Sequence, residues 1–168
     1  MINTDKAGVD REDQDRKCPE TEIRGTLQDN AGTLYPYTLT ICGELHDWRV
    51  FDRERRIGYA WCILAEEEFK LMDWKFENEV VFPRSFWARL LGRSPEIRNF
   101  RRRGLGNRLL PLLVDHARES GARRVTGMIS SEDLEEFPTL ADWYGRLGFT
   151  FVPAASAGRI MGHIELRL

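Results

Sequence analysis

The sequence lacks the long apolar runs that membrane-spanning helices require. No stretch approaches the roughly eighteen consecutive apolar residues of such a helix. Residues 1–5 open a polar, acidic stretch, whereas a secretory signal begins with a basic segment followed by an apolar one. We therefore expect no membrane span, no secretory signal and no membrane partner, and we expect a cytoplasmic protein.

Cysteine and histidine are also scarce. The chain has three cysteines, Cys18, Cys42 and Cys62, an odd number without a C-x-x-C pair. This pattern argues against a disulfide framework and against a zinc site. The three histidines are equally scattered: His46, His116 and His163. We therefore expect no metal site and no histidine-based catalytic triad.

What the chain does contain is enough apolar material for one core. Of its 168 residues 42% are hydrophobic and 11% aromatic. A chain of this size and composition is typical of a single domain. Residues 1–19 carry many charges and almost no large apolar side chains, so we expect a mobile tail there. Residues 20–168 then form the domain.

Charge is distributed unevenly along the chain. The net charge is −2, but between residues 97 and 124 eight arginines stand against Asp115 and Glu119, a local balance of +6. A cluster of this kind indicates an anionic ligand, with a solvated surface as the alternative.

Apolar periodicity predicts the secondary structure. Alternating or short apolar runs predict strands over residues 22–27, 37–42, 48–51, 57–64 and 69–76, the last three as an antiparallel meander. Breakers around residues 80–96 leave room for a helix of one or two turns. Helical spacing predicts a long helix from Leu105 that ends at Gly121, and a second helix over residues 138–147. Strands are expected over residues 125–129, 149–152 and 160–168.

The order strand, arginine-rich glycine loop, helix is suited to holding a pyrophosphate. The start of a helix offers unpaired backbone N–H groups and the positive end of the helix dipole. Glycines let phosphates approach the backbone closely, and arginines add charge and forked donors.

Two segments resemble the acetyl-CoA signatures of the GNAT superfamily of N-acetyltransferases. The first matches the pattern Arg/Gln-x-x-Gly-x-Gly/Ala before a helix: Phe100-Arg101-Arg102-Arg103-Gly104-Leu105-Gly106-Asn107-Arg108-Leu109-Leu110. The second resembles a helix that ends in Tyr-x-x-x-Gly-Phe: Leu140-Ala141-Asp142-Trp143-Tyr144-Gly145-Arg146-Leu147-Gly148-Phe149. The resemblance covers residues 69–168. It implies an α/β (α+β) fold with a central mixed, mostly antiparallel sheet flanked by helices.

The resemblance also implies a site for acetyl-CoA. By position, backbone amides of residues 103–107 would hold the pyrophosphate, while individual arginines would touch phosphates or merely face solvent. The implied cofactor-binding residues are Arg101, Arg102, Arg103, Gly104, Leu105, Gly106, Asn107 and Arg108. The strand before the loop should separate from its neighbour, so that pantetheine can lie along its free backbone groups.

Catalytic residues follow from the same resemblance. Tyr144 matches the family's general acid, which protonates the departing CoA thiolate, although packing against Trp143 would also explain a tyrosine there. A carboxylate on the strand before the loop would accept the proton of the amine. By position this is Asp73 or Glu77, with an ordinary surface role as the alternative for both.

Three features depart from the family pattern. About twenty residues, 80–99, separate the strand from the loop. One interpretation is that they form a lid or substrate wall with an apolar face of Phe82, Phe86 and Trp87. The alternative is that the strand over residues 69–76 is wrongly assigned. Pro111 lies inside the predicted long helix, where it removes a backbone hydrogen bond. The region before Trp48 shows no clear pair of helices.

The sequence therefore predicts an N-acetyltransferase that transfers an acetyl group from acetyl-CoA directly to a primary amine in a ternary complex. The acceptor is a small-molecule or peptide amine, and a homodimer is left open. The alternative is a catalytically inactive GNAT-fold module that binds CoA or nucleic acid. Aromatics interleaved with basic residues would favour nucleic acid, and only Phe100 fits that description.

Overall fold

The structure is a computed structural model that describes residues 20–84, 86–155 and 158–168. The expected tail over residues 1–19, with Cys18, lies outside the described residues.

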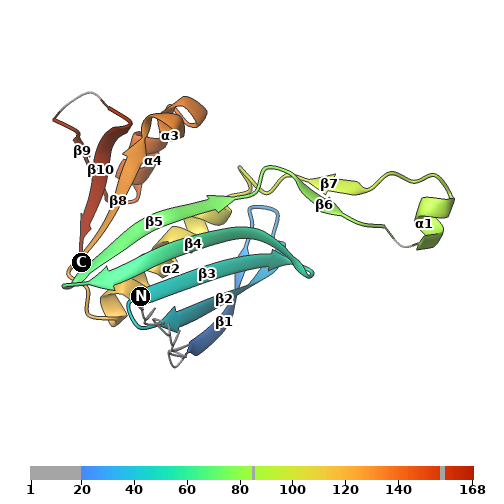
Figure 1. Ribbon diagram of the computed structural model, residues 1–168, viewed down its shortest axis with the longest axis horizontal. Coiled ribbons are helices and arrows are strands. Elements are labelled where there is room, and N and C mark those ends of the chain that lie inside the picture. The colour runs from blue at the N-terminus through green and yellow to red at the C-terminus, as the bar shows by residue number, and fades with distance from the viewer. Residues whose placement is uncertain (1–19, 85, 156–157) are drawn as a thin grey trace, which may run out of the picture.

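One eight-stranded sheet forms the body of the protein (Figure 1). The strand order is β1-β2-β3-β4-β5-β8-β10-β9, and every pair is antiparallel except β5 with β8. The strands are β1 (Thr21–Gln28), β2 (Leu34–Cys42), β3 (Leu45–Asp52), β4 (Arg55–Ala65), β5 (Glu68–Phe76), β8 (Arg124–Ser130), β9 (Thr150–Pro153) and β10 (Ile160–Arg167). The expected meander is thus confirmed and extends over five strands. Strands β1 and β2 occupy the region in which no helix pair was visible in the sequence.

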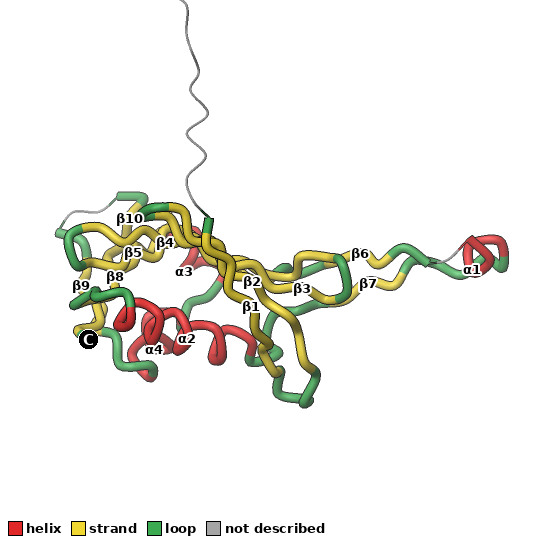
Figure 2. The backbone as a smooth tube through the Cα atoms, turned by 90° about the horizontal axis from the view of Figure 1, so that it is seen from below, coloured by secondary structure: helices red, strands yellow, loops and turns green. Residues whose placement is uncertain are grey.

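Helix α2 (Leu105–Glu119) covers one face of the sheet, as Figure 2 shows. Leu105, Leu109, Leu113 and Ala117 are buried, as the helical spacing in the sequence predicted; Leu110 is also buried, whereas Leu112 of the predicted stripe is only half-buried. Burying a leucine fully contributes about 1.5–3 kcal/mol, so this stripe fixes the helix against the strands. Pro111 lies on the exposed side of the helix, and the helix continues through it.

Two short helices follow β8. The sequence predicted α4 (Leu140–Arg146) but not α3 (Ser131–Glu136). A capping box starts α3: the Ser130 hydroxyl accepts from the N–H of Asp133, and the Asp133 carboxylate accepts from the N–H of Ser130. The Ser-x-x-Asp spacing was a local signal for this start.

Residues 80–98 form an arm that projects away from the body (Figures 1 and 2). Strands β6 (Val80–Phe82) and β7 (Glu96–Arg98) pair as a hairpin, and α1 (Phe86–Leu90) lies near its tip. The expected single apolar face is wrong. Phe82 is buried at the base beside Phe100, whereas Phe86 and Trp87 are each 71% exposed at the tip. The hairpin ladder is the physical reason, because it carries the tip away from the core.

The two faces of the sheet differ in what they carry. His46 contacts His116 of α2, and Trp74 lies next to Gly106, so the rows of residues paired with these two face α2. Their neighbours along each strand therefore face away, since side chains alternate. The face turned away from α2 carries one row of Asp47, Trp61 and Asp73 and a second row of Arg49, Tyr59 and Lys75. We call it the outer face.

None of the described helices has both the length and the apolar character needed to cross a bilayer.

Candidate functional site

The glycine loop ends in a helix start without a side-chain cap. Gly104 is the N-cap of α2 and adopts a left-handed conformation with φ of 79°. It has no side chain to cap the N–H groups of the first turn, and that turn carries no acidic residue. A Cβ at Gly104 would overlap the side-chain amide of Asn30, so both backbone conformation and space require glycine here. The positive end of the helix is thereby left open to a ligand.

Gly106 differs from Gly104 in what its missing Cβ would meet. The nearest atoms would be in the rings of Trp74, at 3.5 Å, and Trp143, at 3.6 Å, which are ordinary contact distances. Packing within the described residues therefore does not demand glycine at this position. The bare backbone of the first turn leaves space for a close approach from outside.

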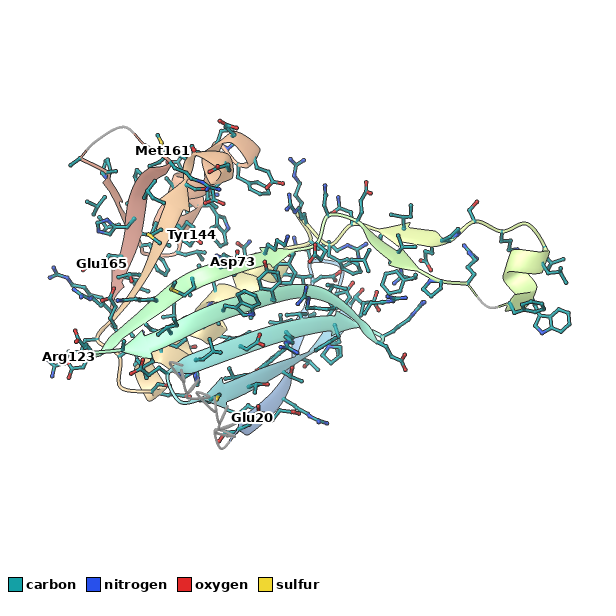
Figure 3. All side chains as sticks on the ribbon, in the orientation of Figure 1. Glu20, Asp73, Arg123, Tyr144, Met161 and Glu165 are labelled. Carbon is teal, nitrogen blue, oxygen red and sulfur yellow. The ribbon has the colours of Figure 1, made fainter. Side chains whose placement is uncertain are left out.

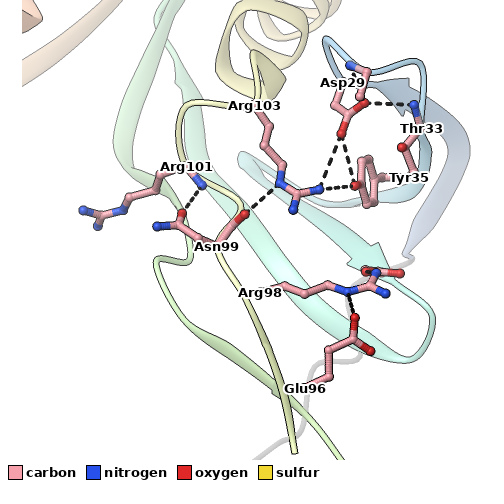
Figure 4. A network of polar contacts seen from close by, with 10 residues as sticks. Asp29, Thr33, Tyr35, Glu96, Arg98, Asn99, Arg101 and Arg103 are labelled. Atoms are coloured by element: carbon pink, nitrogen blue, oxygen red, sulfur yellow. Dashed lines mark hydrogen bonds and ion pairs between the residues drawn. The ribbon is translucent and has the colours of Figure 1, made fainter.

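Arg101 and Arg103 tie the loop to the body. Arg101 Nε donates to the carbonyl of Phe76 at 3.0 Å, and its guanidinium pairs with Glu136. Arg103 Nε donates to the carbonyl of Asn99 at 2.7 Å, and its Nη1 donates to the Tyr35 hydroxyl at 3.0 Å (Figure 4). Both side chains are thus occupied by contacts within the chain. The Arg103 side chain, which remains 36% exposed, is thus held from inside the chain.

Carboxylates pair with most of the arginines in this segment, and all but one of the pairs bring in a carboxylate from outside residues 97–124. Six of the eight arginines form ion pairs: Arg98, Arg101, Arg103, Arg118, Arg123 and Arg124. Within the part of the chain that the structure describes, Arg102 and Arg108 have no such pair, and both are exposed. These two remain as cations beside the open helix start.

Strands β5 and β8 separate beyond the middle of β5. Their parallel pairing covers residues 68–71 of β5, from Glu68 opposite Arg124 to Leu71 opposite Gly127. Figure 1 shows the two strands starting side by side and then running apart. On the β4 side, pairing is interrupted at Met72, because Trp61 pairs with Asp73 and Cys62 pairs with Leu71. The expected separation is confirmed. It leaves one edge of residues 72–76 unpaired with β8, where an extended ligand can bind.

Three aromatic side chains line the α2 side of this opening. Trp74 of β5 stacks on Trp143 of α4 with ring centroids 5.6 Å apart, and Trp143 Nε1 donates to Asn107 Oδ1 at 2.6 Å. Trp74 Nε1 donates to the Tyr144 hydroxyl at 2.7 Å. Tyr144 is 5% exposed, and burial raises the pKa of its hydroxyl. The phenol is therefore neutral at physiological pH, and its own O–H proton is left to donate.

Asp73 and Glu77 lie on the other side of β5. Figure 3 labels Asp73 on β5 and Tyr144 across the opening. Asp73 Oδ2 accepts from the Tyr59 hydroxyl at 2.6 Å, and burial together with this carboxylate raises the pKa of Tyr59 to about 12. Glu77 follows β5; its N–H donates to the carbonyl of Ile57, and its carbonyl accepts from the N–H of Phe100. The acid and base candidates thus face opposite sides of one strand.

Comparisons with known proteins find structural neighbours only. No family model and no curated protein matches the sequence. The GNAT domain of PAT from S. lividans aligns with 86% of this chain and 97% of its own, at 9% identity and a TM-score of 0.59. PaiA N-acetyltransferase from Thermoplasma acidophilum, in complex with coenzyme A, aligns at 11% identity and a TM-score of 0.52. The ribosomal-protein-S18-alanine N-acetyltransferase from Escherichia coli covers 76% of this chain and 71% of its own, at 13% identity and a TM-score of 0.50.

This chain has the GNAT acetyltransferase fold. The mixed, mostly antiparallel sheet with flanking helices confirms the fold class expected from the two signatures. The alignment with PaiA covers 74% of this chain but only 62% of the PaiA chain, less than two thirds of its length.

Within this GNAT fold, sequence reasoning missed one buried polar pair. His46 Nδ1 of β3 and His116 Nε2 of α2 lie 2.8 Å apart, so two histidines that are far apart in the sequence are in contact in the fold. Burial lowers the pKa of both imidazoles, that of His46 to about 4. No motif links residues 70 positions apart. The described residues contain no cluster of three or more His, Cys, Asp or Glu side chains placed to hold a metal ion.

Proposed function

We propose that this protein is an acetyl-CoA-dependent N-acetyltransferase that acts on a primary amine by direct transfer in a ternary complex. One observation carries the proposal: β5 leaves β8 next to the uncapped start of α2, and the buried Tyr144 hydroxyl lies at that opening. Support also comes from two neighbours with the same fold, PaiA and an acetyltransferase of Bacillus subtilis, which were solved in complex with CoA.

The residues present suit this ligand. Backbone N–H groups of the first turn of α2, beside Gly106, would hold the pyrophosphate, and Arg102 and Arg108 would add charge to the phosphates. Residues 72–76 would bind pantetheine along their free edge. Acetyl-CoA supplies a thioester carbon that an amine nitrogen can attack.

Tyr144 and a carboxylate divide the proton transfers. The incoming amine must be uncharged to attack, so Asp73 or Glu77, on the outer side of β5, would accept its proton directly or through water. The C–N bond then forms and the C–S bond breaks. Tyr144, whose oxygen is held by Trp74, would donate its O–H proton to the departing thiolate. The nitrogen loses its extra proton as the amide forms, and a proton returned through water restores the Tyr144 phenol. No covalent enzyme intermediate is required.

Cofactor binding is tested first. Acetyl-CoA should raise the melting temperature of the wild type, and Gly106→Asp should weaken its binding at least tenfold, about 1.4 kcal/mol, by placing a carboxylate beside the phosphates. Gly106 suits the test because an added Cβ meets only ordinary contacts. Gly145→Asp is the matched control, since its Cβ would meet nothing within 4 Å. Absence of any shift in the wild type would remove the basis of the proposal.

Turnover is tested second, as release of free CoA thiol with a panel of amines. Tyr144→Phe should lower kcat at least tenfold while leaving the Kd for acetyl-CoA within about twofold, since only the hydroxyl is lost. Wild-type binding of acetyl-CoA without turnover across peptides, polyamines, aminoglycosides and amino acids would favour the inactive CoA-binding module. A nucleic-acid-binding module is less well supported, because carboxylates already pair with six of the eight arginines.

A further inference from the structure

A cleft of about 550 Å³ opens on the outer face at the root of the arm. Arg49 and Phe51 from β3 and Arg56 from β4 line it on one side. Glu77, Glu79 and the valines of β6 complete its lining. The cleft therefore brings two guanidinium groups and two carboxylates to one concave surface.

These opposite charges do not neutralise one another. None of the ion pairs formed by the described residues involves Arg56, Glu77 or Glu79. Arg49 is partly occupied, because its Nε donates to Asp47 Oδ2 at 2.9 Å. The guanidinium of Arg56 instead lies over the ring of Tyr59, 5.0 Å from its centroid. The cleft thus offers a free cation and free carboxylates to a ligand that carries both signs of charge.

The cleft also adjoins the site proposed for the reaction. Glu77 directly follows Phe76, whose carbonyl accepts from Arg101 at the start of the glycine loop. Tyr59, beneath Arg56, donates to Asp73, the other candidate base. An acceptor in the cleft would approach β5 from the outer face, while the start of α2 lies on the opposite face.

We propose that this cleft binds the acceptor, and that the acceptor is an amine that also carries an anionic group, a carboxylate or a phosphate. Glu77 and Glu79 receive the ammonium group, and Arg56 binds the anion through its forked donors, with Arg49 adding positive charge. A diamine would place its second ammonium against these guanidinium groups, whereas a hydroxyl would leave them unpaired. The acetylation step rests on the proposed function; the binding preference does not.

Three acceptors with the same four-carbon chain separate these cases: 4-aminobutyrate, 4-amino-1-butanol and 1,4-diaminobutane. Calorimetry on the CoA-saturated protein measures binding, and thiol release measures kcat/KM. We expect 4-aminobutyrate to be preferred at least tenfold. The same comparison with shorter and longer homologues, from 3-aminopropionate to 6-aminohexanoate and their alcohols and diamines, determines the best spacing between the amine and the anion. O-phosphoethanolamine tests phosphate as the anion.

Arg56→Gln should abolish the preference for the carboxylate, mainly through KM, and Arg56→Lys should restore part of it. Arg55→Gln, the preceding exposed arginine of β4 that does not line the cleft, should leave it unchanged. Equal or better binding of the diamine, or a preference that survives Arg56→Gln, would overturn the inference. Acetylation of all three amines at equal rates would support the proposed function and contradict the proposed role of the cleft. Selective binding of the carboxylate without turnover would support the role of the cleft and contradict the proposed function.

Discussion

Asp29 should be the residue on which the position of the glycine loop depends. Its side chain is only 2% exposed, in the turn between β1 and β2. Oδ1 accepts from the N–H groups of Ala31 at 2.9 Å and Thr33 at 2.8 Å. Oδ2 accepts from the Tyr35 hydroxyl at 3.2 Å and lies 3.6 Å from Arg103 Nη1 (Figure 4). One buried carboxylate thus connects a distant turn to the loop before α2.

Asp29→Ala removes the acceptor for all of these groups at once. Breaking a buried, hydrogen-bonded ion pair on one side costs about 3–5 kcal/mol. A domain of this size loses about 2–4 °C in Tm per kcal/mol. We therefore expect a Tm lower by at least about 6 °C. Asp29→Asn keeps Oδ1 for the two N–H groups but turns an amide towards Arg103, so its cost should be smaller, about 1–2 kcal/mol.

The assay is urea unfolding of the three proteins, with Asp115→Ala as the control. Asp115 also pairs with an arginine, Arg118, but is 62% exposed, so its loss should stay within about 0.5 kcal/mol. A cost below about 1 kcal/mol for Asp29→Ala would refute the reasoning, because the loop would then be held without this contact. Acetyl-CoA affinity measured on the folded variant should also fall.

The pH dependence of Asp29 has a definite sign. Burial alone would raise the pKa of its carboxyl, but the N–H groups of Thr33 and Ala31, the Tyr35 hydroxyl and Arg103 together hold it below its ordinary value of 3.8. A carboxyl with a lowered pKa stabilises the fold fully above the unfolded pKa. The contribution should be lost as the pH falls below about 3.8, and Asp29→Asn should lack this part of the profile.

Three further predictions concern stability. Burial lowers the pKa of His46 from 6.5 to about 4, so the unfolded chain binds the proton first. The free energy of unfolding should therefore fall by up to about 3 kcal/mol as the pH is lowered from 6.5 to 4. Urea unfolding of the wild type and His46→Asn across this pH range checks this, and an equal dependence of stability on pH in the two proteins would contradict it. Trp87→Ser at the exposed tip of the arm should change the free energy of unfolding by less than about 0.5 kcal/mol, and a larger loss would mean that the arm packs against the body. Pro111→Ala should restore a helical hydrogen bond but also make the unfolded chain more flexible, so the net gain in the free energy of unfolding should be about 1–2 kcal/mol. An unchanged Tm would show that α2 already accommodates the missing donor.

Local patterns were enough to predict most secondary structure and the CoA signature. The spacing of Leu105, Leu109 and Leu113 predicted α2, because one helix face repeats every three to four residues. The glycines and arginines before it predicted the anion site, since a helix start needs few residues to bind phosphate. The strands of the arm gave no such signal, because a three-residue strand such as β6 is too short for its alternation to be read.

The sequence alone therefore determined where most strands and helices form and where an open helix start with glycines lies, because those depend on neighbours within one or two turns. Only the tertiary structure decided which charges remain available there. Arg103 is bound to Tyr35, 68 positions away, while Arg102 and Arg108 are left exposed. Tertiary structure also joined His46 to His116 and put Arg56 and Glu77 into one cleft. Such pairings follow from sheet order and register, which no short stretch of sequence specifies.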